Sequence, residues 1–233
     1  MNEVLFARLK SSMPTNQDLC KSVTTRILQD LNSQFIKQNF SRILSEIHEE
    51  IYEEYKSKEK ALSQSLFDEL VRESGRIDFD ELNAFFLSLT ASRKARAGSA
   101  FEYMIGGLLM QLKYPFDTQV TIDGAKPDFV LPSEEFFRER PLDSLILTAK
   151  RTLRERWRQV VTEANKAYGF YLVTLDERIS ANQLAGASDH KVYVVTTSQI
   201  IENNQDYRSA YNVLSFEQFF SEHLDPLMSR WGH

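Results

Sequence analysis

The sequence predicts an α/β protein in which a mixed β-sheet is flanked by helices and preceded by an N-terminal helical arm. Three observations predict this class. Apolar residues recur at helical spacing up to about Ser88, and short runs rich in β-branched and aromatic residues follow Thr90. A helical segment also lies between two of those runs, and the order strand, helix, strand indicates a βαβ unit.

The arm is predicted to contain helices only. Apolar periodicity predicts helices over residues 19–31 and 35–51, a third from Leu62 to about Gly75, and a fourth over 80–89. Acidic residues recur along 46–59, so we expect a solvated helix face from Glu46, Glu49, Glu50, Glu53, Glu54 and Glu59.

Beyond the arm, the pattern changes to alternating elements. Residues 100–112 read as an apolar helix, and residues 154–168 read as a second helix with one apolar side. The β-rich runs predict strands over 120–122, 129–131, 145–149, 170–174 and 192–196. We place a boundary between subdomains 1–90 and 91–233, within one folding unit because no linker rich in Pro, Gly or Ser separates them.

Composition limits the class of protein further. The chain has 233 residues, of which 42% are hydrophobic and 26% charged, as expected of a globular protein with a substantial core. No run approaches the ~18 apolar residues of a membrane span, and residues 1–6 lack the pattern of a secretory signal, so we expect a cytoplasmic protein. Cys20 is the only cysteine, which excludes an internal disulfide and indicates a buried thiol.

The distribution of charge favours a polyanionic partner although the net charge is −5. Residues 150–166 hold six basic residues against two acids, and residues 93–96 hold a second basic cluster. A protein that is acidic overall but basic around one site can still bind phosphates there. We expect contacts to a nucleic-acid backbone from Arg93, Lys94, Arg96, Arg151 and Arg158.

Two residues could act on a phosphodiester. Asp128 follows Pro127, which favours a strand start or sheet edge, and its carboxylate is a hard oxygen ligand suited to Mg²⁺. Lys150 ends the apolar run 145–149, where an ammonium can contact the attacking water and a phosphate oxygen. Taken singly, such charged residues are more often solvated or paired surface groups, so the prediction depends on their joint occurrence.

A second acid is missing from its usual place two residues before the lysine, since position 148 is Thr. Glu163, on the helix predicted to follow the Lys150 strand, is the candidate replacement, and Glu102 on the preceding helix is a possible third acid.

A charged triplet at the start of the same predicted helix suits base recognition. Arg can donate two hydrogen bonds to guanine and Glu can accept from cytosine, so Arg154, Glu155 and Arg156 could read G·C pairs in the major groove. As a bare tripeptide the signal is weak, because such triplets usually form solvated helix faces.

Several of these segments together resemble the C-terminal catalytic domain of the EcoRII-type restriction endonucleases, within the group that cuts CCGG, CCNGG and CCWGG sites. The resemblance runs from Arg93 to about Leu224, and it is carried by residues 93–102, 126–133, 148–152, 155–160 and 163–164. It implies a restriction-endonuclease-like fold with a PD-(D/E)xK site whose second acid has moved from the strand to the next helix, so that Thr148 is expected.

The resemblance also implies roles. Asp128 and Glu163 match the metal-binding acids, Lys150 matches the catalytic lysine, and Glu102 matches an additional helix carboxylate. Arg154, Glu155 and Arg156 match the segment that contacts the CC:GG pairs. The implied activity is Mg²⁺-dependent, site-specific cleavage of double-stranded DNA by a homodimer, with a cognate DNA methyltransferase in the same system.

Some alternatives stay open. Family members that cut five-base-pair sites flip the central bases out of the stack, and the sequence does not decide whether this chain does so. The 233 residues leave no room for the N-terminal effector domain of EcoRII, so we expect a compact relative or a catalytic fragment. A repair or structure-specific nuclease of the same fold and an inactive DNA-binding module are the competing functions.

Overall fold

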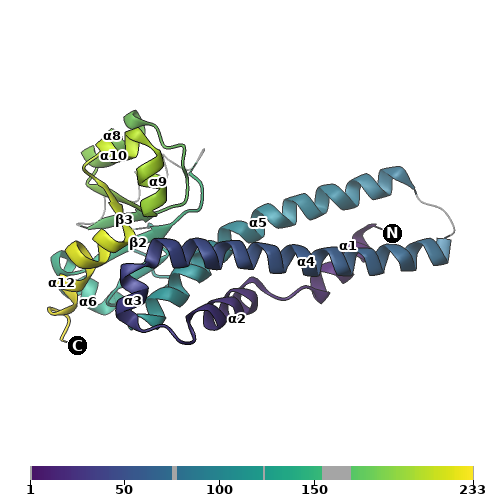
Figure 1. Cartoon of the computed structure of the whole chain (residues 1–233), viewed down its shortest axis with the longest axis horizontal. Coiled ribbons are helices and arrows are strands. Elements are labelled where there is room, and N and C mark those ends of the chain that lie inside the picture. The colour runs from purple at the N-terminus through teal and green to yellow at the C-terminus, as the bar shows by residue number, and fades with distance from the viewer. Residues whose placement is uncertain (1, 75–77, 123, 154–168, 233) are drawn as a thin grey trace. The chain divides into compact units, whose positions relative to one another are not determined.

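A computed structural model describes residues 2–74, 78–122, 124–153 and 169–232 and confirms the α/β class (Figure 1). The chain forms two compact units, Met1–Ile27 with Glu46–Met104 and Leu28–Ser45 with Ile105–His233. Within the described residues no helix has the length and apolar character needed to cross a membrane. The predicted boundary at residue 90 falls inside a continuous helix, and the division into 1–90 and 91–233 stays a prediction.

The first unit is helical, as predicted for the arm. It contains α1 (Asn2–Ser12), most of α2 (Asn16–Leu28) and the greater part of two long helices, α4 (Phe40–Ser74) and α5 (Phe79–Gln111). The predicted breaks within these long helices are wrong, because 40–74 and 79–111 each run without interruption. No proline occurs in either helix, and a single glycine such as Gly98 is tolerated at a cost of about 1 kcal/mol.

Cys20 is buried in the first unit, at 2% exposure, which confirms the expected buried thiol. Burial removes water from the thiolate form and raises the pKa of this group to about 12. The thiol is therefore neutral at physiological pH and behaves as a small apolar side chain.

The second unit holds a five-stranded sheet in the order β1-β2-β3-β4-β5. The strands are β1 (Phe129–Leu131), β2 (Leu145–Ala149), β3 (Phe170–Val173), β4 (Val192–Thr196) and β5 (Val213–Ser215). β1 pairs with β2 in antiparallel fashion, and the other three pairs are parallel, so the sheet is mixed as predicted. All described strands except β4 are buried at every residue, as expected for central, mostly parallel strands.

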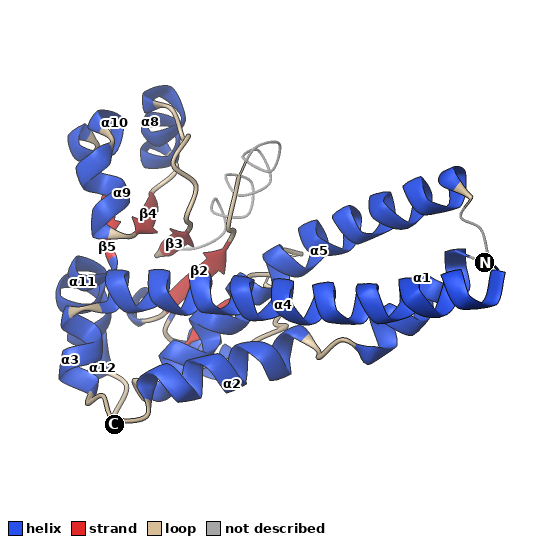
Figure 2. Ribbon diagram, turned by 45° about the vertical axis from the view of Figure 1, so that its right-hand side comes forward, coloured by secondary structure: helices blue, strands red, loops and turns tan. Residues whose placement is uncertain are grey.

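Helices cover both faces of the sheet. Figure 2 shows α8 (Ala181–Asp189), α9 (Ser198–Asn203) and α10 (Gln205–Ser209) gathered beside β3, β4 and β5. Their residues Leu184, Ile200 and Tyr207 share one apolar cluster with Phe170 and Leu172 of β3. The remaining elements are α3 (Ser33–Gln38), α6 (Glu134–Glu139), η1 (Pro141–Asp143), α11 (Phe216–Gln218), the π-helix η3 (Phe219–Leu224) and α12 (Asp225–Met228).

On the opposite face, Tyr171 packs against Phe219 of η3 with ring centroids 5.0 Å apart. The last turns of α5 approach β1 closely, since a Cβ on Gly106 would lie 3.2 Å from the Phe129 ring. Alternate residues of the strands therefore face two different helical layers, which fixes the register of the sheet.

Two of the strand predictions need correction. Residues 120–122 do not form a strand, because only an isolated bridge joins Ile122 to Ala125 across a tight turn. β5 was not predicted, because three residues give too short an alternation to recognise. The predicted helix over 154–168 lies outside the described residues.

We expect Leu172→Ala to lower the free energy of unfolding by about 2–5 kcal/mol, because Leu172 is fully buried in the central strand and its removal leaves a cavity. Urea denaturation followed by circular dichroism measures this loss. Leu142→Ala is the matched control, since Leu142 is 71% exposed and its loss should change stability by less than about 0.5 kcal/mol. Equal effects of the two substitutions would contradict the assigned core.

Candidate active site

The candidate site lies at the edge of the sheet where the parallel strands end. Asp128 comes directly before β1 and Lys150 directly after β2. Because these two strands are antiparallel, the start of one lies beside the end of the other. The carboxyl ends of parallel strands are the usual place for ligands in α/β sheets.

Asp128 and Lys150 form an ion pair, as their joint occurrence in the sequence suggested. Lys150 Nζ donates to Asp128 Oδ2 at 2.7 Å, and the side chains are only 15% and 17% exposed. The same oxygen accepts the backbone N–H of Ala149 at 2.7 Å. Continuing the register of β1 and β2 would place Pro127 opposite Ala149, and the Asp128 carboxylate takes over the N–H of Ala149 at this end of the ladder.

Thr148 occupies the strand position that would carry a second acid. Its side chain is 1% exposed, and its Oγ1 has no hydrogen-bond partner in the described part of the chain. If the register of β1 and β2 is continued by one residue, Thr148 lies opposite Asp128. The Thr148 hydroxyl and the Asp128 carboxylate therefore belong to the same end of this strand pair.

The donor set is suited to a hard cation but incomplete among the described residues. The hydrogen bonds from Ala149 and Lys150 both end on Oδ2 of Asp128, and a carboxylate has a second oxygen that can bind Mg²⁺. Within ranges 2–74, 78–122, 124–153 and 169–232, no group of three His, Cys, Asp or Glu residues could hold a metal ion. Glu163, the predicted second acid, lies outside these ranges.

The described structure does not test the other predicted acids and the base-reading residues, which stay predictions. Glu102 is half-buried on α5 and belongs to the first unit, which is described by itself. Glu163, Arg158 and the triplet Arg154, Glu155 and Arg156 lie outside the described residues. Arg151 is half-exposed directly after the candidate lysine.

The basic cluster of α5 has internal partners. Arg93 Nε donates to Glu59 Oε2 at 2.7 Å, and its Nη2 makes a second contact with the same oxygen. This pairing raises the pKa of Arg93. Arg96 Nη1 donates to the carbonyl of Pro14 at 2.9 Å. Lys94 lies between Arg93 and Arg96 in the sequence of α5.

Glu59 itself was expected on a solvated helix face, and that expectation is wrong. The residue is 2% exposed, and the hydroxyl of Tyr55 donates to its Oε1 at 2.7 Å. A buried carboxylate needs such partners, because an unpaired charge is costly away from water.

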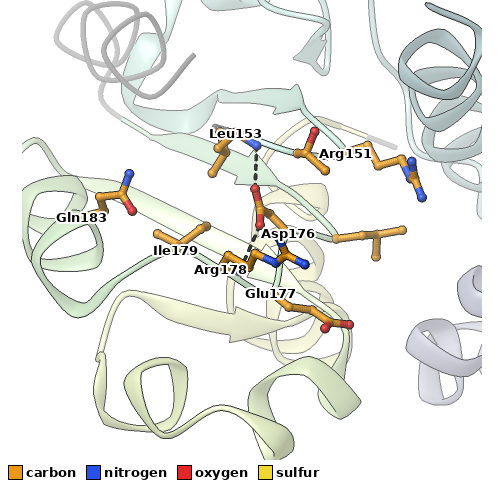
Figure 3. A pocket seen from close by; sticks show the side chains of 9 residues that line it. Arg151, Leu153, Asp176, Glu177, Arg178, Ile179 and Gln183 are labelled. Carbon is orange, nitrogen blue, oxygen red and sulfur yellow. Dashed lines mark hydrogen bonds between the residues drawn. The ribbon is translucent and has the colours of Figure 1, made fainter. Parts of the chain in front are cut away.

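The sequence analysis missed Asp176, which follows β3 at the same sheet edge. Asp176 is 8% exposed, and its Oδ2 accepts the backbone N–H of Leu153 at 2.7 Å. The position was accessible from the sequence, since an acid two residues beyond the predicted strand 170–174 falls at the ligand-binding edge. A pocket of about 410 Å³ lies beside it, with walls that include Arg151, Leu153 and Arg178 (Figure 3).

Comparison with known proteins identifies the family. The model of the family described as EcoRII C terminal matches residues 55–220, which is more than half of the chain. The chain belongs to this family. The match includes Asp128, Lys150 and Asp176, so the sheet edge is part of the EcoRII C-terminal domain.

Two curated relatives are similar to this member of the EcoRII C-terminal family. The type II restriction enzyme SsoII of Shigella sonnei is 33% identical in an alignment of 159 residues, and the match covers 63% of this chain and 51% of SsoII. The type II restriction enzyme EcoRII of Escherichia coli is 35% identical over 127 residues, 52% of this chain and 31% of EcoRII. The matched part thus spans about half of the length of SsoII and about a third of the length of EcoRII.

Solved structures support the fold of this EcoRII C-terminal family member along its whole length. Metal-depleted Ecl18kI in complex with uncleaved DNA is 26% identical with a TM-score of 0.84, covering 100% of this chain and 85% of that one. The restriction endonuclease PspGI in a complex with substrate DNA is 21% identical with a TM-score of 0.69, covering 95% and 94%. The latter likeness concerns the fold alone.

We expect Asp128→Ala to destabilise the metal-free protein by about 1–3 kcal/mol, because the Ala149 N–H and the Lys150 ammonium both lose their acceptor. Asp128→Asn keeps one carbonyl oxygen for Ala149 and should cost less. Urea denaturation in EDTA measures both variants. Asp189→Ala, which removes an exposed carboxylate from α8, is the control and should be near neutral.

Proposed function

We propose that the chain is the catalytic part of a type II restriction endonuclease that hydrolyses double-stranded DNA at a short C/G-rich site of the CCWGG or CCNGG type. The observation that carries the proposal is the Asp128–Lys150 pair at the ligand-binding sheet edge of an EcoRII C-terminal family member. Further support comes from the relatives, which are named restriction enzymes, and from a similar solved structure, Ecl18kI, which is in complex with uncleaved DNA.

The proposed chemistry assigns a role to each charged group. Asp128 would hold Mg²⁺ through its carboxylate, together with Glu163, and Glu102 would add a further acid. When bound, the metal ion relieves charge on the scissile phosphate and lowers the pKa of a water molecule. Lys150, already held beside Asp128, would donate to a phosphate oxygen and orient the attacking water.

Recognition would use a separate set of residues. Arg154, Glu155 and Arg156 would contact G·C base edges in the major groove. Contacts to the DNA backbone would come from Arg93, Lys94, Arg96, Arg151 and Arg158. For Arg93 and Arg96 these contacts must form beside their internal partners Glu59 and Pro14.

Two strands of opposite direction require two cuts, so the active form would be a homodimer in which each copy cuts one strand. A cell that carries such an enzyme needs protection of its own sites, which implies a partner DNA methyltransferase. Both partners are parts of the proposal.

We expect the purified protein to cut plasmid DNA into discrete fragments in Mg²⁺, and Lys150→Ala to reduce the cleavage rate by at least about 100-fold, because it removes a group that stabilises the transition state. Agarose gels and end sequencing of the fragments measure activity, site and stagger. Lys191→Ala is the control, since Lys191 is an exposed lysine of the same unit. Structure-dependent nicking would favour a repair nuclease, and specific binding without cutting would favour an inactive module.

We expect Glu163→Ala to abolish Mg²⁺-dependent cleavage while specific binding in Ca²⁺ persists. Arg154→Ala should weaken specific binding by about 1–3 kcal/mol for each bidentate contact that is lost. Gel-shift titrations with specific and random duplexes measure the difference. Normal cleavage by Glu163→Ala would refute the displaced acid. Equal weakening of both duplexes by Arg154→Ala would assign this residue to the phosphate backbone instead.

A further inference from the structure

The three residues that follow Lys150 are tied to the loop after β3. Leu153 N–H donates to Asp176 Oδ2 at 2.7 Å, and the Thr174 hydroxyl lies 3.4 Å from the Arg151 carbonyl, to which it donates. Thr174 Oγ1 in turn accepts the N–H of Asp176 at 3.0 Å. Two adjacent strand ends are thus connected by side chains immediately beyond the last residue pair of the sheet.

Asp176 is itself rigidly held. Its Oδ1 accepts the N–H of Arg178 at 3.0 Å, and its carbonyl accepts the hydroxyl of Tyr207. The Tyr207 oxygen also accepts the N–H of Ile179 at 3.2 Å, and the tyrosine is 1% exposed. Figure 3 shows the carboxylate between the two segments, with dashed bonds to Leu153 and Arg178.

The bond from Arg178 is an ordinary local turn of a loop aspartate, but the bond from Leu153 joins two segments that are distant in the sequence. Asp176 does not cap the next helix, because α8 begins at Ala181 with Ser180 as its N-cap. It is not a solvated surface group either, because it is 8% exposed. Both of its oxygens accept backbone N–H groups, and only a carboxylate can accept two such bonds without presenting a donor of its own.

Packing and this hydrogen bond act on different parts of Leu153. Its side chain is 2% exposed and belongs to the same apolar cluster as Ile179, whereas its backbone N–H is held by the Asp176 carboxylate. A pocket of about 410 Å³ beside the bond is lined from both segments, by Arg151, Thr152 and Leu153 and by Leu175, Asp176, Glu177, Arg178, Ile179 and Gln183. Loss of the carboxylate would leave the buried N–H of Leu153 without this acceptor.

We propose that Asp176 is a positioning residue for sequence discrimination, which holds the backbone of residue 153, directly before the base-reading triplet in the sequence, in a fixed position relative to Lys150. The inference rests on the proposed function, in which Lys150 acts on the phosphate and Arg154 follows Leu153 directly. The hydrogen bond between Asp176 and Leu153 couples cleavage at Lys150 to base recognition by the triplet. Its loss therefore makes cleavage less dependent on the base sequence.

Asp176→Asn tests the inference, because asparagine keeps one acceptor and directs an amide donor at the other backbone N–H. Thr174→Val weakens the same link at a second point with little change of volume. Glu177→Gln is the matched control, because it removes a negative charge from the adjacent, exposed residue. Circular dichroism and the unfolding midpoint establish that each variant is folded.

The measurement is the ratio of cleavage rates on the cognate duplex and on duplexes with one altered base pair, together with affinity for random DNA in Ca²⁺. We expect Asp176→Asn to lower this ratio by about 10- to 100-fold, as small misplacements of positioned groups do, with Thr174→Val changed in the same direction. Affinity for random DNA stays unchanged, and Glu177→Gln retains the wild-type ratio. Hydrogen exchange of the peptide containing Leu153 becomes faster in both link variants.

A folded Asp176→Asn with the wild-type ratio overturns the inference while the proposed function stands. Equal loss on cognate, altered and random DNA also overturns it, because that pattern belongs to a general loss of structure. If Asp176→Asn does not fold, Thr174→Val decides by the same criteria. A wild-type protein that cuts no DNA in Mg²⁺ refutes the proposed function itself, and the inference falls with it.

Discussion

The antiparallel pairing of β1 with β2 is the constraint on which the candidate site depends. Asp128 precedes its strand and Lys150 follows its own, so a parallel pair would place them at opposite ends of the sheet. The remaining strand pairs are parallel, which brings the residues after β3 to the same edge. One reversed strand therefore assembles a carboxylate, an ammonium and the buried Asp176 at a single edge.

Much of the sheet could be predicted because its strands are short, apolar and bounded by turn residues. The runs 129–131 and 145–149 match β1 and β2 to the residue, and with them the positions of Asp128 and Lys150. The long helices were harder to predict, because changes in apolar periodicity within 40–74 and 79–111 resemble helix ends although no proline interrupts either segment. Whether neighbouring helical patterns form one helix is decided by packing along the helix as much as by local sequence.

The site was predictable only where its residues carry a motif. Counting charges placed Glu59 on a solvated face, yet Glu59 is buried and pairs with the half-exposed Arg93, which no count of charges reveals. Asp176 was missed for a related reason, because its partners are backbone N–H groups of Leu153 and Arg178, which every residue but proline possesses. A hydrogen bond from a backbone N–H to a side chain requires no particular residue type at the donor, so the sequence does not reveal it.

The Asp128–Lys150 pair also explains how two poorly exposed charges at this sheet edge are stabilised when no charged ligand is bound. At 17% and 15% exposure, either charge alone would be poorly solvated, and each stabilises the other until a ligand competes for it. A cation that binds Asp128 weakens the hold of the carboxylate on the ammonium, and a phosphate offers the ammonium a new acceptor. In the proposed function the two ligands therefore favour each other's binding, because each satisfies the charge that the other releases.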